Sequence, residues 1–316
     1  MRLCEKIARK EFIVCAELGP PQSCDDAVIR KKAGCFRGIV DAVNITDNQT
    51  AIVRLSSIAA GKILLEEGVE PIVQMTCRDR NRIAIQSDLL GAAAMGIENL
   101  LCLTGDHQRF GDHPEAKGVF DLDSIQLIAT VRQMNAGSLL SGQTLKKAPR
   151  FCIGAAANPF AEPLEIRLIR LEKKIRSGAD FIQTQPVFDL ERFGRWLELA
   201  RRRGLHEQTA LLAGVLPVKS ARALEYMARE VPGMRIDPSY LERMRAAAEP
   251  QEEGVKIALE LIQALRRMAG VSGIHLMPVL WESITPRIIQ EAGLLPAEAP
   301  VTGRAPGAGH ERPIQS

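Results

Sequence analysis

The sequence predicts an α/β protein that folds as a single (β/α)8 barrel, the TIM-barrel architecture. Eight short apolar runs alternate with longer amphipathic stretches from one end of the chain to the other. The length of 316 residues suits one barrel domain. The competing doubly wound sheet usually carries a glycine-rich phosphate loop after an early strand, and neither GxGxxG nor GxxxxGKS/T occurs here.

Each predicted strand is almost continuously apolar, as expected of parallel strands that are buried on both faces. In chain order, the predicted strands are residues 12–18, 41–46, 70–76, 99–105, 150–157, 181–187, 210–218 and 273–279. Residues 166–178 and 255–270 have apolar side chains at helical spacing and end at a glycine, so they predict two of the intervening helices. We expect one domain over residues 1–296 and a disordered, Pro- and Gly-rich tail over residues 297–316.

The composition indicates a soluble globular protein, with 46% hydrophobic residues, 25% charged residues and a net charge of +3. Nucleic acid is not an expected partner because no basic block is present, and no apolar run is long enough to span a bilayer. The first residues lack the apolar core of an export signal, which predicts a cytoplasmic protein. Several of the seven cysteines lie in apolar runs and match no ligand motif, so we expect buried thiols, no disulfides and no metal site.

Two carboxylates close apolar runs, at the end of the barrel where such enzymes carry their site. Glu17 ends the first run, where a buried carboxyl group suits a general acid working near neutrality. Asp106 follows Gly105 after the fourth run, where the backbone can approach a ligand closely. Alternatively, Glu17 pairs with a buried Lys or Arg, and Asp106 caps the next turn.

Other polar residues near the strand ends allow both a functional and a structural interpretation. Gln74, Gln183 and Gln185 suit recognition of a flat heterocycle through paired amide hydrogen bonds, or satisfy neighbouring backbone groups. Lys173 and Lys174 are either a phosphate-binding pair or the solvated face of a helix. His275, on an apolar strand, is expected to be a core histidine.

Six motifs occur in order, each at or near the end of a predicted strand. They are AELGPP (16–21), VNITDN (43–48), QMTC (74–77), LTGDH (103–107), GADFIQTQPVFD (178–189) and GVLPV (214–218). In this ordered set the chain resembles the methylenetetrahydrofolate reductase family, in particular its bacterial single-domain form. The resemblance covers roughly residues 1–290.

The resemblance implies a flavin in the barrel mouth, FAD in preference to FMN, that reduces 5,10-methylenetetrahydrofolate to 5-methyltetrahydrofolate by hydride transfer. It implies that Glu17 is the general acid, that Asp106 lies near the flavin and the pterin, and that Gln185 contacts the folate. The residues at the positions of the family's flavin contacts are Thr46, Gln74, Thr104, Gly105, Asp106, Ala156, Asn158, Lys173 and Lys174.

The chain departs from the family pattern at three positions. Ala221 stands where the family often has an aromatic residue, and Asn158 and Glu162 stand where it has a flavin-binding tyrosine and histidine. We therefore expect poor use of NAD(P)H and electrons from a partner subunit or small redox protein, within a homo- or hetero-oligomer. Two alternatives to a reductase are a pterin-binding methyltransferase barrel and a barrel subunit of a larger redox complex.

Overall fold

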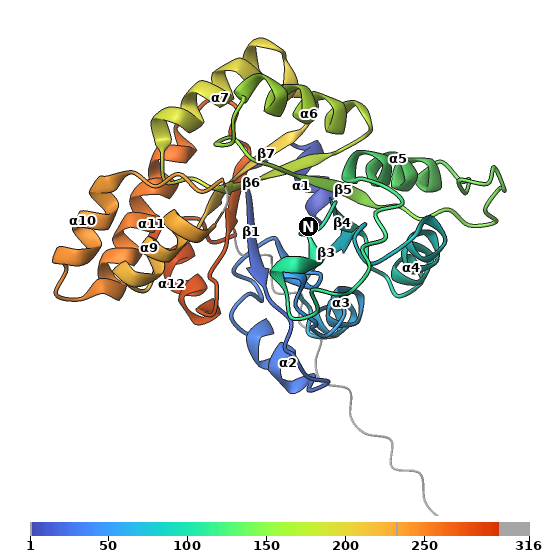
Figure 1. Ribbon diagram of the computed structural model, residues 1–316, viewed down its shortest axis with the longest axis horizontal. Helices are drawn as coiled ribbons and strands as arrows, with labels where there is room; N and C mark the ends of the chain where they lie inside the picture. Colours follow the sequence, from blue (N-terminus) through green and yellow to red (C-terminus); the bar gives the residue numbers. More distant parts are fainter. Residues whose placement is uncertain (1, 232, 297–316) are drawn as a thin grey trace, which may run out of the picture.

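The computed structural model describes residues 2–231 and 233–296. Eight parallel strands form one closed barrel in chain order, and helices surround it (Figure 1). The strands are β1 (Ile13–Leu18), β2 (Ala42–Ile45), β3 (Pro71–Thr76), β4 (Asn99–Leu103), β5 (Cys152–Ala157), β6 (Phe181–Pro186), β7 (Ala210–Val215) and β8 (Gly273–Leu276). The predicted single (β/α)8 barrel is confirmed. The predicted tail at 297–316 lies outside the described residues.

Every predicted strand contains one observed strand, and the predictions overrun the observed ends most at β7 and β8. β7 and β8 each end three residues before the predicted end. The extra residues are apolar and include Pro217 and Pro278, which lack the N–H needed to extend a strand ladder. Apolar character therefore continues past the strand into the loops that cover the barrel mouth.

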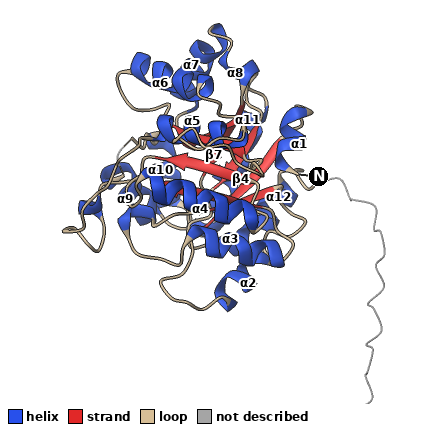
Figure 2. Ribbon diagram, turned by 90° about the vertical axis from the view of Figure 1, so that its right-hand side faces the viewer, coloured by secondary structure: helices blue, strands red, loops and turns tan. Residues whose placement is uncertain are grey.

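Helices enclose the barrel from the outside, as Figure 2 shows. They are α1 (Leu3–Ala8), α2 (Ala27–Ala33), α3 (Ser57–Glu66), α4 (Arg82–Ala94), α5 (Ser124–Asn135), α6 (Leu164–Arg176), α7 (Leu190–Arg202), α8 (Leu205–Gln208), α9 (Ala221–Glu230), α10 (Pro238–Ala246), α11 (Pro250–Arg266) and α12 (Thr285–Glu291). The two predicted helices correspond to α6 and α11. Of the helices in the described ranges, none combines the length and apolarity that a membrane crossing requires.

The barrel interior changes from apolar to polar along the strands. At the amino end, Ile13, Ile72 and Phe181 pack together, and Leu3 of α1 joins this cluster and closes the barrel bottom. Gly154 of β5 makes room for the Phe181 ring, because a Cβ at this glycine would lie 2.2 Å from Phe181 Cζ. The carboxyl end is lined by polar side chains instead, so the fold opens a polar site at that end.

The cysteines follow the prediction only in part. All seven are free thiols, and those inside the strands are buried as expected. Cys4 and Cys24 are exposed, so the prediction of buried thiols is wrong for these two. Cys4 lies in the short α1 and Cys24 in the loop after β1, and neither segment is enclosed as the strands are.

Candidate active site

A cavity of about 350 Å³ opens at the carboxyl ends of the strands. This volume lies within the range of sites that bind small organic molecules, about 300–1,000 Å³. Most of the predicted site residues line this cavity: Glu17, Gln74, Thr104, Gly105, Asp106, Ala156, Lys174, Gln183 and Gln185. The fold thus gathers residues from strands far apart in the sequence around one opening.

Glu17 lies on β1 with its side chain 13% exposed. Gln74 Nε2 donates to Glu17 Oε2 at 3.3 Å, and His275 Nε2 lies 3.6 Å from the same oxygen. No Lys or Arg in the described ranges pairs with Glu17, so the alternative that Glu17 pairs with a buried Lys or Arg is wrong. His275 is buried, as predicted for a core histidine, but it also lines the cavity beside the candidate acid.

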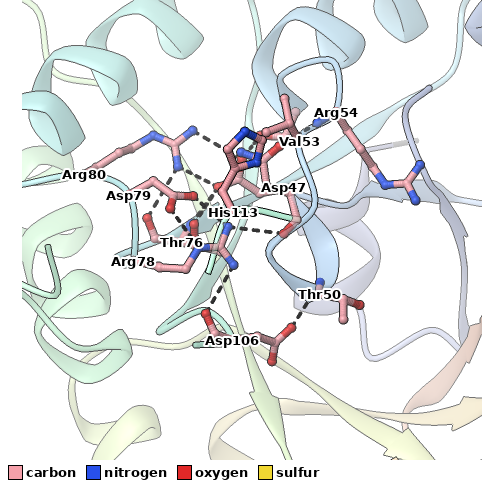
Figure 3. A network of polar contacts seen from close by, with 12 residues as sticks. Asp47, Thr50, Val53, Arg54, Thr76, Arg78, Asp79, Arg80, Asp106 and His113 are labelled. Atoms are coloured by element: carbon pink, nitrogen blue, oxygen red, sulfur yellow. Dashed lines mark hydrogen bonds and ion pairs between the residues drawn. The ribbon is translucent and has the colours of Figure 1, made fainter. Parts of the chain in front are cut away.

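Asp106 is exposed at the cavity rim. Its Oδ2 accepts a hydrogen bond from the backbone N–H of Thr50 at 3.2 Å (Figure 3). Asp106 therefore caps the loop after β2, and not the turn that follows Asp106 in the chain. Gly105 has φ +93°, and a Cβ there would lie 2.9 Å from Arg78 Cβ. Only glycine therefore lets the chain turn past Arg78 and present Asp106 to the cavity.

The buried Arg78 and the half-buried Arg80 join the ends of β2, β3 and β4 (Figure 3). Arg80 forms an ion pair with Asp47, whose carboxylate also accepts from the backbone N–H and the hydroxyl of Thr76 at 2.9 and 3.0 Å. Arg78 pairs with Asp79 and donates to the backbone oxygen of Asp106 at 3.3 Å. These charge-assisted contacts hold the loops that carry the rim of the cavity.

The two glutamines of β6 have different environments. Gln183 is 3% exposed, and its Oε1 accepts a hydrogen bond from Asn44 Nδ2 at 2.7 Å. Gln185 is exposed and lines the cavity. Gln185 is therefore free to contact a bound molecule, whereas the carbonyl oxygen of Gln183 is already engaged at the cavity floor.

A second cavity of about 190 Å³ adjoins the first. It is lined by Ala156, Ala157, Asn158, Arg167, Arg170, Leu171, Lys174 and Gln185, with no carboxylate among them. Lys174 Nζ donates to the Ala156 carbonyl at 2.5 Å, and burial, assisted by the nearby Arg170, lowers the pKa of Lys174 to about 8. Within the described ranges, Arg167 and Arg170 form no ion pair. Three cationic groups without a counter-ion make this cavity suitable for an anion.

Three predicted site residues do not line the first cavity. Asn158 lines the second cavity, and its Oδ1 accepts from the Phe160 backbone at 2.9 Å. Thr46 is buried at the end of β2, and Lys173 is exposed on α6; neither lines either cavity. Adjacent helical residues point about 100° apart, so Lys173 and Lys174 cannot both face the site.

Sequence reasoning missed several residues that line the cavities. Arg167 and Arg170 precede Lys174 by seven and four residues, the spacing of one helix face, and this signal could have found them. Arg78 follows the predicted strand at 70–76 and has no comparable signal. Its role depends on loops that the sequence does not place next to each other.

Known proteins resemble this chain along most of its length. Methylenetetrahydrofolate reductase 2 of Schizosaccharomyces pombe is 27% identical in an alignment of 263 residues, and the match covers 76% of this chain and 38% of that protein. 5,10-Methylenetetrahydrofolate reductase of Pectobacterium carotovorum is 25% identical in an alignment of 238 residues, and the match covers 72% of each chain. The chain spans only 36–38% of the length of the yeast and nematode relatives that it matches.

Among solved structures, a Clostridium thermocellum protein that binds two copies of 5-methyl-5,6,7,8-tetrahydrofolic acid superposes with a TM-score of 0.63. Its sequence identity is 15%, and the match covers 92% of this chain and 96% of that one. At this identity the likeness shows the shared fold alone. Residues 2–293 match the sequence model of the family described as Methylenetetrahydrofolate reductase. Since this match spans nearly the whole barrel, the chain belongs to the methylenetetrahydrofolate reductase family.

Proposed function

We propose that this chain reduces 5,10-methylenetetrahydrofolate to 5-methyltetrahydrofolate with hydride from a bound reduced flavin. One observation carries the proposal: Glu17, Asp106 and Gln185 line a single cavity at the carboxyl end of the barrel. A proton donor, a fixed negative charge and an amide that can recognise a heterocycle are the groups that this reduction requires.

The two adjoining cavities fit a flavin nucleotide, FAD or FMN. The first cavity is large enough for a small organic ring system, and the second offers Arg167, Arg170 and Lys174 to a phosphate group. These cations have no carboxylate partner among the described residues, and a phosphate would supply the missing negative charge. When bound, the reduced flavin supplies the hydride. The chain orients the reactants and excludes water.

The chain's own residues would supply the proton chemistry. The methylene carbon of the folate bridges two nitrogens, and one carbon–nitrogen bond must break before the carbon accepts hydride. Glu17 would donate its proton to the departing nitrogen, which makes that nitrogen a better leaving group. The opened substrate carries positive charge, which the carboxylate of Asp106 would stabilise from the rim. Gln185 would hold the pterin through its amide.

We further propose that a partner protein supplies the electrons in preference to NAD(P)H. Ala221 begins α9 beside the barrel mouth, and its methyl group offers no ring on which a nicotinamide could stack. A partner subunit or a small redox protein would instead reduce the flavin at the open end of the barrel.

The test begins with the absorbance spectrum of the purified chain, reconstituted with FAD or FMN if it is colourless. The flavoprotein is mixed anaerobically with NADH and NADPH, and we expect slow bleaching with both. It is then photoreduced and mixed with 5,10-methylenetetrahydrofolate. We expect flavin reoxidation together with formation of 5-methyltetrahydrofolate. Failure to bind either flavin, or a reduced flavin that the folate does not reoxidise, contradicts the proposed reduction.

The informative variant is Glu17→Gln, which keeps the shape of the side chain and removes its proton. We expect reoxidation by the folate to slow by about 10²- to 10⁴-fold while flavin stays bound. Glu70→Gln is the matched control, because Glu70 is also a largely buried carboxyl group but accepts from Leu3 and Asn99 at the amino end of β3. The control should react like the wild type. Equal rates for the two variants contradict the role of Glu17.

A further inference from the structure

Arg78 lies two residues after β3, in the wall of the first cavity. Its side chain is 3% exposed, and the Asp79 carboxylate holds it in place. Nε and Nη2 of Arg78 donate to the two oxygens of that carboxylate at 2.8 and 2.6 Å. This bidentate pair fixes the plane of the guanidinium. The nitrogen Nη1 and the second proton of Nη2 remain for other partners.

These remaining donors reach backbone carbonyls in the loops after β2 and β4. Arg78 Nη2 donates to the oxygen of Asn48 at 3.2 Å, and Nη1 donates to the oxygen of Asp106 at 3.3 Å. The backbone of Arg78 takes part as well, because its carbonyl accepts from the N–H of Val119 at 2.7 Å. Arg78 therefore holds both arms of the loop between β4 and α5, and it ties that loop to the loop after β2.

The contacts of Arg78 close a ring that includes the side chain of Asp106 (Figure 3). Asp106 Oδ2 accepts from the N–H of Thr50 at 3.2 Å, and Thr50 is two residues after Asn48. The ring runs from Arg78 through Asp106 to Thr50, and it returns to Arg78 through Asn48. Asp106 Oδ1 receives no hydrogen bond from the residues that the structure describes. One carboxylate oxygen is thus engaged by the chain, which leaves the other to interact with a bound molecule.

From this ring we infer that Arg78 is a positioning residue for Asp106. Loops hold side chains less precisely than strands do, and a displacement of about 1 Å can lower a rate by about 10²-fold. Arg78 fixes the backbone of Asp106 and the loop that caps its carboxylate, so the negative charge keeps its place toward the opened, positively charged folate. A lysine cannot do the same, because its ammonium group lacks the planar fork that reaches three partners at once. The inference rests on the proposed function and adds the residue that places its stabilising charge.

The kinetic test is a double-mutant cycle between Arg78→Lys and Asp106→Asn. The asparagine oxygen can still accept from Thr50, so Asp106→Asn removes the charge and keeps the cap. We expect Arg78→Lys alone to slow reoxidation of the reduced flavin by the folate about 10- to 100-fold, with the half-saturating folate concentration unchanged. In the Asp106→Asn background, the same change should slow it by less than about twofold. Arg82→Lys is the matched control and should react like the wild type, because Arg82 also forms a bidentate pair, with Asp121, but is exposed.

A wild-type rate in Arg78→Lys overturns the inference. An equal loss with and without Asp106→Asn also overturns it, because Arg78 would then act independently of the charge. Asp79→Asn is the second variant, for use if Arg78→Lys does not fold. The Asp79 side chain is 41% exposed, and its substitution leaves the guanidinium without its anchor. We expect a smaller loss that again disappears in the Asp106→Asn background, and a wild-type rate in Asp79→Asn overturns the inference.

A second measurement does not depend on turnover. Hydrogen–deuterium exchange of the purified protein is followed at the Thr50 amide, which donates to Asp106. We expect this exchange to be at least about tenfold faster in Arg78→Lys than in the wild type, and unchanged in Arg82→Lys. Equal exchange in these two variants overturns the inference. If the wild type does not reduce the folate, the proposed function fails, while the exchange measurement still decides whether Arg78 holds the loop.

Discussion

The ion pair between Asp47 and Arg80 gives a prediction whose magnitude follows from the structure. The Asp47 side chain is 1% exposed, and its carboxylate accepts from Arg80 Nη1 at 2.6 Å and from Thr76. In Asp47→Asn, whichever way the amide turns, its NH2 group meets a nitrogen of Arg80 or the donors of Thr76. Arg80 also loses a buried counter-charge. We expect the free energy of unfolding to fall by about 3–5 kcal/mol, the range for removing one partner of a buried pair.

Asp88→Asn is the matched control, because it removes the other carboxylate that Arg80 contacts. The Asp88 side chain is 41% exposed and lies 2.9 Å from Arg80 Nε. Exposed pairs contribute about 0–1 kcal/mol, so this variant should be nearly as stable as the wild type. Urea denaturation followed by circular dichroism measures both losses under one set of conditions. If the two variants lose the same free energy of unfolding to within about 0.5 kcal/mol, the reasoning is refuted, because burial would then not explain how much each ion pair stabilises the fold.

Two further predictions concern the helix face beside the second cavity and the barrel interior. The folded-state pKa of Lys174, about 8, lies below its ordinary value of 10.5, so the unfolded chain binds more protons between these pH values. Relative to Lys174→Met, the wild-type free energy of unfolding should rise by up to about 3 kcal/mol from pH 8 to pH 10.5. If the free energies of unfolding of the two proteins change in parallel with pH, this prediction is wrong. Gly154→Ala places a Cβ within 2.2 Å of the Phe181 ring, so the free energy of unfolding, measured by urea denaturation, should fall by about 1–3 kcal/mol. Adding Phe181→Leu to this variant should recover part of the loss. Additive losses from the two substitutions would contradict this packing.

The strands could be predicted from the sequence because a parallel strand buried on both faces produces a continuous apolar run. The same property hid the strand ends, since the loops after β7 and β8 are apolar as well. Period-two spacing of polar residues indicates which of them share one face of a strand. Gln183 and Gln185 are two residues apart on β6, as Asn44 and Thr46 are on the strand at 41–46, and this spacing places both members of a pair on one face.

The contrast between Lys173 and Lys174 shows why the sequence motif did not predict which residues line the cationic cavity. A pair of adjacent lysines looks like a phosphate-binding motif, but on a helix only one of them can face inward. The structure places Lys174 at the cavity and Lys173 in solvent. Arg167 and Arg170 share the inward face of the helix with Lys174. The cationic cavity is therefore predicted by residues at helical spacing, and not by two adjacent lysines.

The two candidate acidic groups are supported in different ways, and this bears on how the site works. Glu17 is on a strand and accepts a hydrogen bond from Gln74 of β3, and strands hold side chains more precisely than loops do. Asp106 depends on loops, where Asn48, Thr50 and Ala51 have left-handed φ angles of 46°, 58° and 58°. Such angles are unfavourable for non-glycine residues, and the contacts of Arg78 and Arg80 with these loops help to offset their cost. The proposed proton donor is therefore fixed by the barrel itself, whereas the proposed stabilising charge depends on the ion pairs that hold the rim in place.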